Sequence, residues 1–207
     1  MSAQKLNQVD ARHTYGRADT CVNKDMLEKM KRAGFNWVWV GFESSSQAVR
    51  ESVGKIYSNN TAKKCATNLK EAGINLLANH IVGLRGETRQ DMENTLAEAM
   101  EMLPEFWNVY CATPYPGSPL YTRAVKEGWP LPNKWEDYSQ HSKNFVPHGT
   151  ESVSPAEVVA FRDEAFLKFF RNPLYLEKMR IKFGESVKQD IISMTNVKLD
   201  RAHVAIS

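Results

Sequence analysis

The chain has 207 residues, 42% hydrophobic and 25% charged, which is the composition of an ordinary globular protein with one domain, or one domain and an extension. A formal net charge of +3 without a dense block of lysines or arginines argues against a nucleic-acid-binding protein. No apolar stretch reaches the roughly 18 residues of a membrane span, and the N-terminal residues are polar, so we expect a cytoplasmic protein with neither a membrane span nor a secretion signal.

The first predicted unit is a weak strand over 11–15 followed by a helix and a second strand. Asn23 is a suitable N-cap for the helix, whose apolar residues follow at helical spacing. Gly34 suits the left-handed conformation that often ends a helix. The apolar run that comes next predicts a buried strand over 37–41.

The same unit is repeated 39 residues later, because Lys-x-Ala-Gly-apolar-Asn occurs at 31–36 and again at 70–75. Asn60 or Thr61 is expected to start the second helix, and Gly73 to end it. A strand over 75–82 follows.

A third unit has a helix that begins at Thr88 and ends at Pro104, followed by a strand over 106–112. Nearly continuous apolar strands that alternate with helices predict an α/β fold with a parallel sheet covered by helices. Four such strands do not close a barrel, so we expect two open sheet edges.

The last third of the chain differs in composition and no longer alternates between strands and helices. A short helix from Ser118 to about Lys126 is followed by a proline-rich, loop-like stretch over 128–153. We therefore predict an α/β part over 1–127 and a loop and helical extension over 128–207. The helices predicted in this extension cover 155–171, 174–182 and 185–194.

Polar side chains follow the second predicted strand. Ligands of parallel α/β folds bind at the carboxyl ends of strands. Glu43 and Ser44 lie there, and a carboxylate directly after a buried strand is unfavourable unless something binds it. Hydroxyl or amine groups of a ligand could donate to it. Ser45 and Ser46 are better explained as caps of the helix predicted over 47–52.

Two further strand ends are rich in glycine and proline. The segment 83–88 has two glycines and leads into a helix, so its backbone could approach a ligand, although a plain tight turn explains it equally well. It is neither a Walker loop nor a G-x-G-x-x-G motif. The segment 114–117 is interpreted as a rigid turn. No Ser-His-Asp order or HExxH motif occurs in the sequence, so the catalytic residues stay unknown.

Taken together and in this order, the strand-end motifs resemble the second half of a radical S-adenosylmethionine (radical SAM) enzyme core, especially in the class associated with a cobalamin-binding domain. The likeness covers roughly residues 11–195. It implies a partial (β/α) barrel with parallel strands, units three to six of that core, and a C-terminal helical appendage. The motifs that carry it are Gly41-Phe42-Glu43-Ser44, Lys55, Gly83-Leu84-Arg85-Gly86-Glu87-Thr88 and Pro114-Tyr115-Pro116-Gly117-Ser118.

The resemblance implies S-adenosylmethionine as a cofactor. Glu43 and Ser44 would face its ribose or amino-acid part, and Ile81 to Gly83 would run along its adenine. Lys55 and Arg17 would lie near its carboxylate, unless they are solvated surface side chains. The residues expected to bind the cofactor are Arg17, Glu43, Ser44, Lys55, Ile81, Gly83 and Pro114.

The chain also departs from the family. It lacks the CxxxCxxC loop that holds the [4Fe–4S] cluster and the glycine-rich second strand end, and Arg85 and Ser118 replace the usual Pro and Thr. The spacing of Cys21, Cys65 and Cys111 does not suit cluster or zinc ligands, so we predict no metal-binding residues.

These departures lead to three hypotheses about function. The first is a truncated or split radical SAM enzyme, in which an N-terminal portion or subunit supplies the cluster, and in this class cobalamin, for radical hydrogen abstraction or methyl transfer. The second, the alternative, is a non-catalytic remnant that binds S-adenosylmethionine, another nucleotide or a protein. The third is a remnant with no ligand that is stable only as a homo-oligomer covering its open edge.

Overall fold

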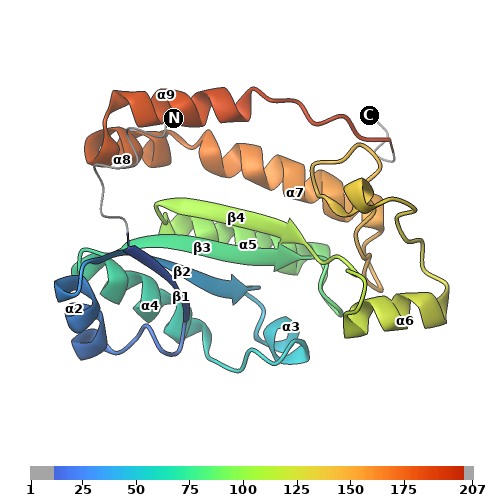
Figure 1. Ribbon diagram of the computed structural model, residues 1–207, viewed down its shortest axis with the longest axis horizontal. Coiled ribbons are helices and arrows are strands. Elements are labelled where there is room, and N and C mark those ends of the chain that lie inside the picture. The colour runs from blue at the N-terminus through green and yellow to red at the C-terminus, as the bar shows by residue number, and fades with distance from the viewer. Residues whose placement is uncertain (1–11, 203–207) are drawn as a thin grey trace.

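The computed structural model describes residues 12–202 and contains one four-stranded sheet with helices around it (Figure 1). The strands β1 (Arg12–Arg17), β2 (Phe35–Glu43), β3 (Asn75–Val82) and β4 (Phe106–Cys111) are all parallel and lie side by side in chain order. The predicted fold class, a partial (β/α) barrel of parallel strands, is therefore confirmed. Ala11, expected as the first residue of the first strand, lies outside the described residues.

Three helices pack against one face of the sheet: α2 (Lys24–Arg32), α4 (Asn59–Glu71) and α5 (Arg89–Met102). The predicted caps of α2 and α5 are confirmed, because Asn23 accepts a hydrogen bond from a first-turn amide and Thr88 forms a capping box with the third residue of its helix. These caps set where each helix leaves the preceding strand, and so where the strand ends lie.

The start of α4 differs from the prediction. The helix begins at Asn59, and Ser58 is its N-cap residue, so neither Asn60 nor Thr61 starts it. The hydroxyl oxygens of Ser58 and Thr61 lie 3.0 Å apart, which links the cap to the first turn. Asn59 instead uses its side chain to bind Arg50, a contact that only the tertiary structure creates.

The two faces of the sheet differ in burial. Because side chains alternate along a strand, every second residue of β2 points to the helices, and from Val38 onward these residues are fully buried. They are Val38, Val40 and Phe42. The residues between them are only partly buried. On this second face, called the open face below, Tyr15 of β1 is 74% exposed and Tyr110 of β4 is 40% exposed.

The C-terminal third lies along β4 (Figure 1). Its helices pack their aromatic side chains into the same core as the sheet; Phe169, for example, is fully buried with its ring 4.9 Å from that of Trp107. The division of the chain after residue 127 stays a prediction. The elements after β4 are α6 (Pro119–Glu127), a 3-10 turn (Trp135–Tyr138), α7 (Pro155–Phe170), α8 (Pro173–Phe183) and α9 (Glu185–Thr195).

The sheet has two edge strands, β1 and β4, as expected, but the edge of β4 is covered by the C-terminal helices. The side chain of Arg162 on α7 donates from Nε to the carbonyl of Val109 at 3.2 Å. The hydroxyl of Tyr175 on α8 donates to the carbonyl of Glu105 at 3.0 Å. Strand-edge carbonyls are thus satisfied by side chains of the C-terminal helices, an arrangement that protects an edge from pairing with another chain.

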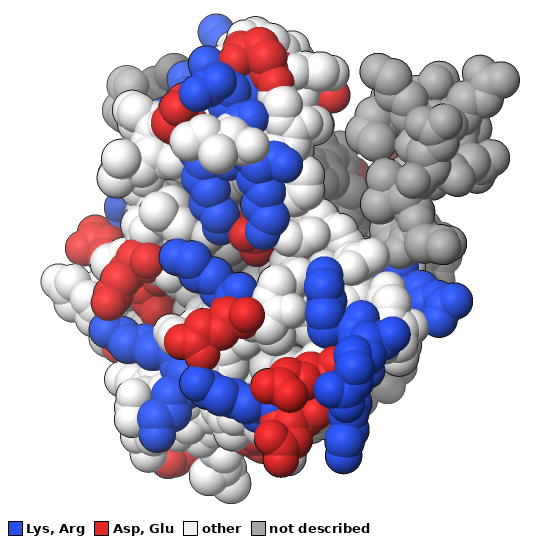
Figure 2. Space-filling model, turned by 90° about the vertical axis from the view of Figure 1, so that its left-hand side faces the viewer, with Lys and Arg blue, Asp and Glu red and all other residues white. Residues whose placement is uncertain are grey.

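Charges of both signs are interspersed on the face at the N-terminal ends of the strands (Figure 2). Ion pairs join neighbouring elements at this end. Lys24 of α2 lies 2.7 Å from Glu71 of α4, and Lys182 of α8 lies 2.9 Å from Glu105. The exposed Lys24–Glu71 pair contributes less than about 1 kcal/mol, whereas the Lys182–Glu105 pair has a buried carboxylate.

Candidate ligand-binding site

A shallow cavity of about 450 Å³ lies over the open face, towards the carboxyl ends of the strands. Four of the seven predicted cofactor-binding residues line it: Arg17, Glu43, Lys55 and Ile81. Tyr15 and Trp39 add aromatic walls, with their rings edge to face and 5.1 Å apart. The cavity therefore combines both signs of charge with apolar surface.

Glu43 and Lys55 form an ion pair within this cavity. Lys55 Nζ lies 3.1 Å from Glu43 Oε1. The side chain of Lys55 is 25% exposed and that of Glu43 is 14% exposed. A Cβ atom at Gly41 would lie only 2.7 Å from the same carboxylate oxygen and 3.3 Å from the ammonium group. Gly41 is thus glycine because the ion pair lies directly over its backbone.

The backbone of Glu43 is strained. Its φ is +65°, a left-handed conformation that costs a residue with a side chain about 1–2 kcal/mol. The pairing of β2 with β3 is also irregular between Gly41 and Glu43. Strained residues of this kind cluster at functional sites, and here the irregularity turns the carboxylate towards the cavity.

Arg17 lies at the end of β1, on the edge of the cavity. Its guanidinium donates two hydrogen bonds to Asp19, at 3.1 and 3.0 Å, and both side chains are largely exposed. These bonds from Arg17 lower the pKa of Asp19. Arg17 can exchange this exposed partner for a ligand at little loss, because exposed ion pairs are weak.

Ser44 lies on the other side of the sheet from this cavity. It is fully buried, its hydroxyl donates to Glu87 Oε1 at 3.0 Å, and its carbonyl accepts from Arg50 at 2.7 Å. The predicted contact of Ser44 with a cofactor stays a prediction. In the structure its polar groups bind Glu87 and Arg50. Ser46 occupies the N-cap position of α3 (Gln47–Ser52), but its side chain makes no capping bond.

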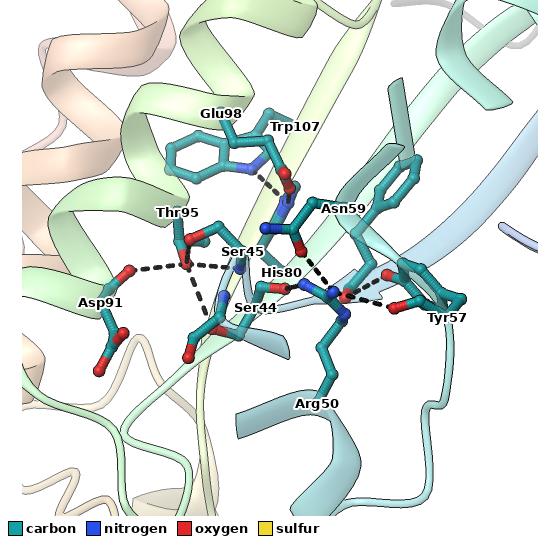
Figure 3. A network of polar contacts seen from close by, with 12 residues as sticks. Ser44, Ser45, Arg50, Tyr57, Asn59, His80, Asp91, Thr95, Glu98 and Trp107 are labelled. Carbon is teal, nitrogen blue, oxygen red and sulfur yellow. Dashed lines mark hydrogen bonds and ion pairs between the residues drawn. The ribbon is translucent and has the colours of Figure 1, made fainter. Parts of the chain in front are cut away.

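The buried guanidinium of Arg50 organises the segment that carries Lys55 (Figure 3). Besides Ser44 it binds the carbonyl of Tyr57 at 3.0 Å and the side chain of Asn59 at 2.6 Å, and it lies 4.6 Å above the ring of Tyr57. Arg50 therefore ties Ser44, directly after Glu43, to the residues that follow Lys55. Sequence reasoning missed this residue, since nothing in its local pattern distinguishes it from a surface arginine.

Gly83 and Pro114 are not brought to the cavity of Glu43. A Cβ atom at Gly83, which has φ +78°, would lie 2.9 Å from Val158 and 3.1 Å from the carbonyl of His148, so this glycine packs against the C-terminal third. Pro114 borders a different cavity, of about 330 Å³, together with Trp129 and His148. Their predicted roles in binding a cofactor stay predictions.

Glu87 is a second residue that sequence reasoning missed as part of the site. It is fully buried, and burial raises its pKa to about 7, against hydrogen bonds that lower it. Its carboxylate joins Ser44 to the backbone of the turn that begins at Gly83. The available signal was an acid in a glycine-containing turn directly before the N-cap Thr88.

A pair of amide side chains lies in the middle of the open face. Asn108 Nδ2 donates to Asn79 Oδ1 at 3.0 Å, and Asn79 lines the cavity. Next to them, burial raises the pKa of Tyr110, which keeps its hydroxyl protonated. These polar groups give the floor of the cavity hydrogen-bonding capacity beyond the charged pair.

On the helix-covered face, a fully buried histidine accepts a hydrogen bond at one ring nitrogen and lies close to a carboxylate at the other (Figure 3). Trp107 Nε1 donates to His80 Nδ1 at 2.8 Å, and His80 Nε2 lies 3.5 Å from Glu98 Oε1. These groups line the core behind β3 and do not reach the open face. Within residues 12–202, no group of three His, Cys, Asp or Glu side chains could hold a metal ion. No helix in this part of the chain is long and apolar enough to cross a membrane.

Several known proteins are similar to this chain in sequence. A family model described as "Radical SAM superfamily" matches residues 3–99. An uncharacterized methyltransferase of Pyrococcus horikoshii is 29% identical over 157 residues, which is 75% of this chain and 33% of the relative. The anaerobic magnesium-protoporphyrin IX monomethyl ester cyclase of Rubrivivax gelatinosus is 27% identical over 161 residues, 77% of this chain and 28% of the relative. The chain thus spans about a third of the length of these curated relatives.

Among solved structures, Elp3 of Methanocaldococcus infernus with an N-terminal deletion matches with a TM-score of 0.51 at 17% identity. The match covers 74% of this chain and 41% of that one. At this level of identity the match shows the shared fold alone.

Proposed function

Because the chain belongs to the radical SAM superfamily, we propose that it is the part of a radical SAM enzyme that binds S-adenosylmethionine and faces the substrate. The observation that carries this proposal is the ion pair of Glu43 and Lys55, held by a strained backbone at the carboxyl end of the sheet. An N-terminal portion or subunit would complete the barrel. The reaction would be radical hydrogen abstraction or radical methyl transfer.

The residues present fit S-adenosylmethionine chemically. The Glu43 carboxylate can accept hydrogen bonds from ribose hydroxyls or the ammonium group, and Lys55 and Arg17 can donate to the carboxylate. Ile81 offers apolar surface to the adenine. When bound, S-adenosylmethionine would supply the radical or methyl-transfer chemistry, and the role of this chain is to hold and orient it.

The iron–sulfur cluster does not fit this chain. Cys21, Cys65 and Cys111 are all buried in the helix-covered core, away from the cavity. We therefore assign the [4Fe–4S] cluster, and cobalamin in this class, to the N-terminal portion. The outer edge of β1 is where a strand from that portion would pair, since β1 is the last strand of the sheet on that side.

Titration calorimetry of the chain with S-adenosylmethionine tests the proposal. We expect Glu43→Ala and Lys55→Met to weaken binding at least about tenfold, a loss of about 1.4 kcal/mol. Glu101→Ala is the matched control, because Glu101 also pairs with a lysine, at 2.8 Å, but lies on helix α5. Equal affinity of the wild type and Glu43→Ala would reject the site, and no binding by the wild type would favour a remnant without this ligand.

A further inference from the structure

Glu87 joins the ends of two neighbouring strands through one buried carboxylate. Its Oε1 accepts from the hydroxyl of Ser44, directly after β2, at 3.0 Å. Its Oε2 accepts from the backbone amides of Gly83 and Leu84, directly after β3, at 2.7 and 3.2 Å. Both oxygens are used, and the side chain is fully buried.

The charges around Glu87 do not neutralise it. Among the described residues, no lysine or arginine forms an ion pair with it, and Asp91 on α5 is a second acid close enough to raise its pKa. Arg50 on α3 reaches the carbonyl of Ser44 and not the carboxylate. From the C-terminal loop, Glu151 binds the amide of Gly86 at 3.0 Å, on the exposed side of the same turn. Hydrogen bonds alone therefore stabilise the anion.

The residue next to Glu43 depends on this carboxylate. Ser44 is held at its hydroxyl by Glu87 and at its carbonyl by Arg50. Glu43 precedes it in a left-handed conformation that needs support from its surroundings. A displacement of Ser44 would move the Glu43 carboxylate relative to Lys55.

We propose that Glu87 is the positioning residue of the Glu43–Lys55 site, because it ties the end of β2 to the turn after β3. It does not touch the ligand. The end of β2 and the turn after β3 are far apart in sequence, so without Glu87 their relative position would depend on strand pairing alone.

Protonation of Glu87 changes this connection in a defined way. The neutral acid would donate its proton to Ser44 Oγ, and the Ser44 hydroxyl would then turn to Thr95 Oγ1, 3.4 Å away. Oε2 would still accept from the two amides, but as a neutral carbonyl, which forms weaker hydrogen bonds than a carboxylate. The connection between the end of β2 and the turn after β3 is therefore tightest when Glu87 is ionised. Because the pKa of Glu87 is raised to about 7, the side chain is mostly ionised only above about pH 7.

Nuclear magnetic resonance of the full chain tests the proposal without a ligand. We expect the amide signals of Gly83 and Leu84 to titrate near pH 7 in the wild type and not in Glu87→Gln, whose carbonyl oxygen can accept from the two amides while its NH2 group donates to Ser44 Oγ, as in the protonated acid. Glu87→Ala should also shift the carboxyl signal of Glu43. Glu105→Gln is the matched control, since Glu105 is a buried acid that binds a backbone amide at the opposite end of the sheet.

The proposal is overturned if the Gly83 and Leu84 signals do not titrate in the wild type, or if Glu105→Gln moves the Glu43 signal as much as Glu87→Ala does. Should Glu87→Ala fail to fold, the comparison of the wild type with Glu87→Gln decides the matter.

A ligand experiment, which rests on the proposed function, extends the test. We expect the affinity for S-adenosylmethionine to rise severalfold between about pH 6 and about pH 8 in the wild type and to stay level in Glu87→Gln. If the affinity of the wild type also stays level between these pH values, as is expected for Glu87→Gln, the positioning role of Glu87 is rejected. No binding at either pH rejects the proposed function, while the carboxyl signal of Glu43 still decides the role of Glu87.

Discussion

Glu43 and Ser44 are neighbours in the chain, but they lie on opposite sides of the sheet and differ in almost every physical respect. Glu43 is partly exposed, strained at its backbone, and paired with Lys55. Ser44 is fully buried and bonded at both its hydroxyl and its carbonyl. The comparison shows that the open face keeps groups with spare bonding capacity, whereas the covered face holds the bonds that set their positions.

The same contrast holds for the aromatic residues of the two faces. On the covered side, Trp107 and Phe169 are fully buried against each other, and Trp107 also donates to His80. On the open side, Trp39 contacts the rings of His13 and Tyr15 and remains partly exposed. Similar residue types therefore stabilise the fold on one face and leave partly exposed aromatic surface on the other.

The largest expected effect compares one aromatic residue from each face. Phe169→Ala should lower the free energy of unfolding by about 3–5 kcal/mol, because it opens a cavity in the shared core. Trp39→Ala should lower it by about 1 kcal/mol, because its ring is only partly buried. Chemical denaturation measures both. Equal losses would mean that the open face is part of the core, and the contrast between the faces would be wrong.

A second prediction concerns the buried acid of the covered face. The pKa of Glu87 in the folded chain is about 7, above its ordinary value of 4.5. A raised pKa means that the folded state binds the proton more tightly than the unfolded state does. Protonated Glu87 therefore contributes its full stabilisation below about pH 4.5, and this stabilisation is lost as the pH rises through about 7. The wild type should lose up to about 3 kcal/mol relative to Glu87→Gln over this range.

Urea denaturation of the two proteins at several pH values measures this difference. Glu105→Gln serves again as the control, since hydrogen bonds from Lys178 and Lys182 outweigh burial and lower the pKa of Glu105. A wild type that gains stability relative to Glu87→Gln as the pH rises would contradict the sign of the prediction.

The smallest effect should come from the strained residue of the open face. Glu43→Gly removes a left-handed strain of about 1–2 kcal/mol together with an ion pair that contributes less than about 1 kcal/mol. We expect a net gain in stability of up to about 1 kcal/mol, with loss of ligand affinity. Lys55→Met loses the pair and keeps the strain, so it should be slightly destabilised. Thermal unfolding measures both variants. If Glu43→Gly is clearly less stable than the wild type, the backbone of Glu43 is not strained as proposed.

Much of the fold was predictable because it depends on local signals. Helix caps such as Asn23 and Thr88, and apolar strands after left-handed glycines such as Gly34, act within a few residues of one another. The start of α4 was misplaced because Ser58, Asn60 and Thr61 are all good caps, and the contact of Asn59 with Arg50 is not local.

The candidate site was predictable only in part. Glu43 and Lys55 were found through motifs, and the structure pairs them. Ser44 was grouped with Glu43, although alternation along a strand places successive side chains on opposite faces. Gly83 and Pro114 were placed at the same rim, but contacts with Val158 and His148 from the C-terminal third turn them elsewhere.

The amino-acid sequence by itself determined the alternation of helices and strands, the parallel sheet and the presence of an acid where a buried strand ends, because each depends on short-range chemistry. Only the tertiary structure decided that Arg50 and Glu87 hold that strand end in place, and that the C-terminal helices cover the edge of β4. Hydrogen bonds of this kind join residues far apart in the chain, and their partners are chosen by packing, which no local pattern records.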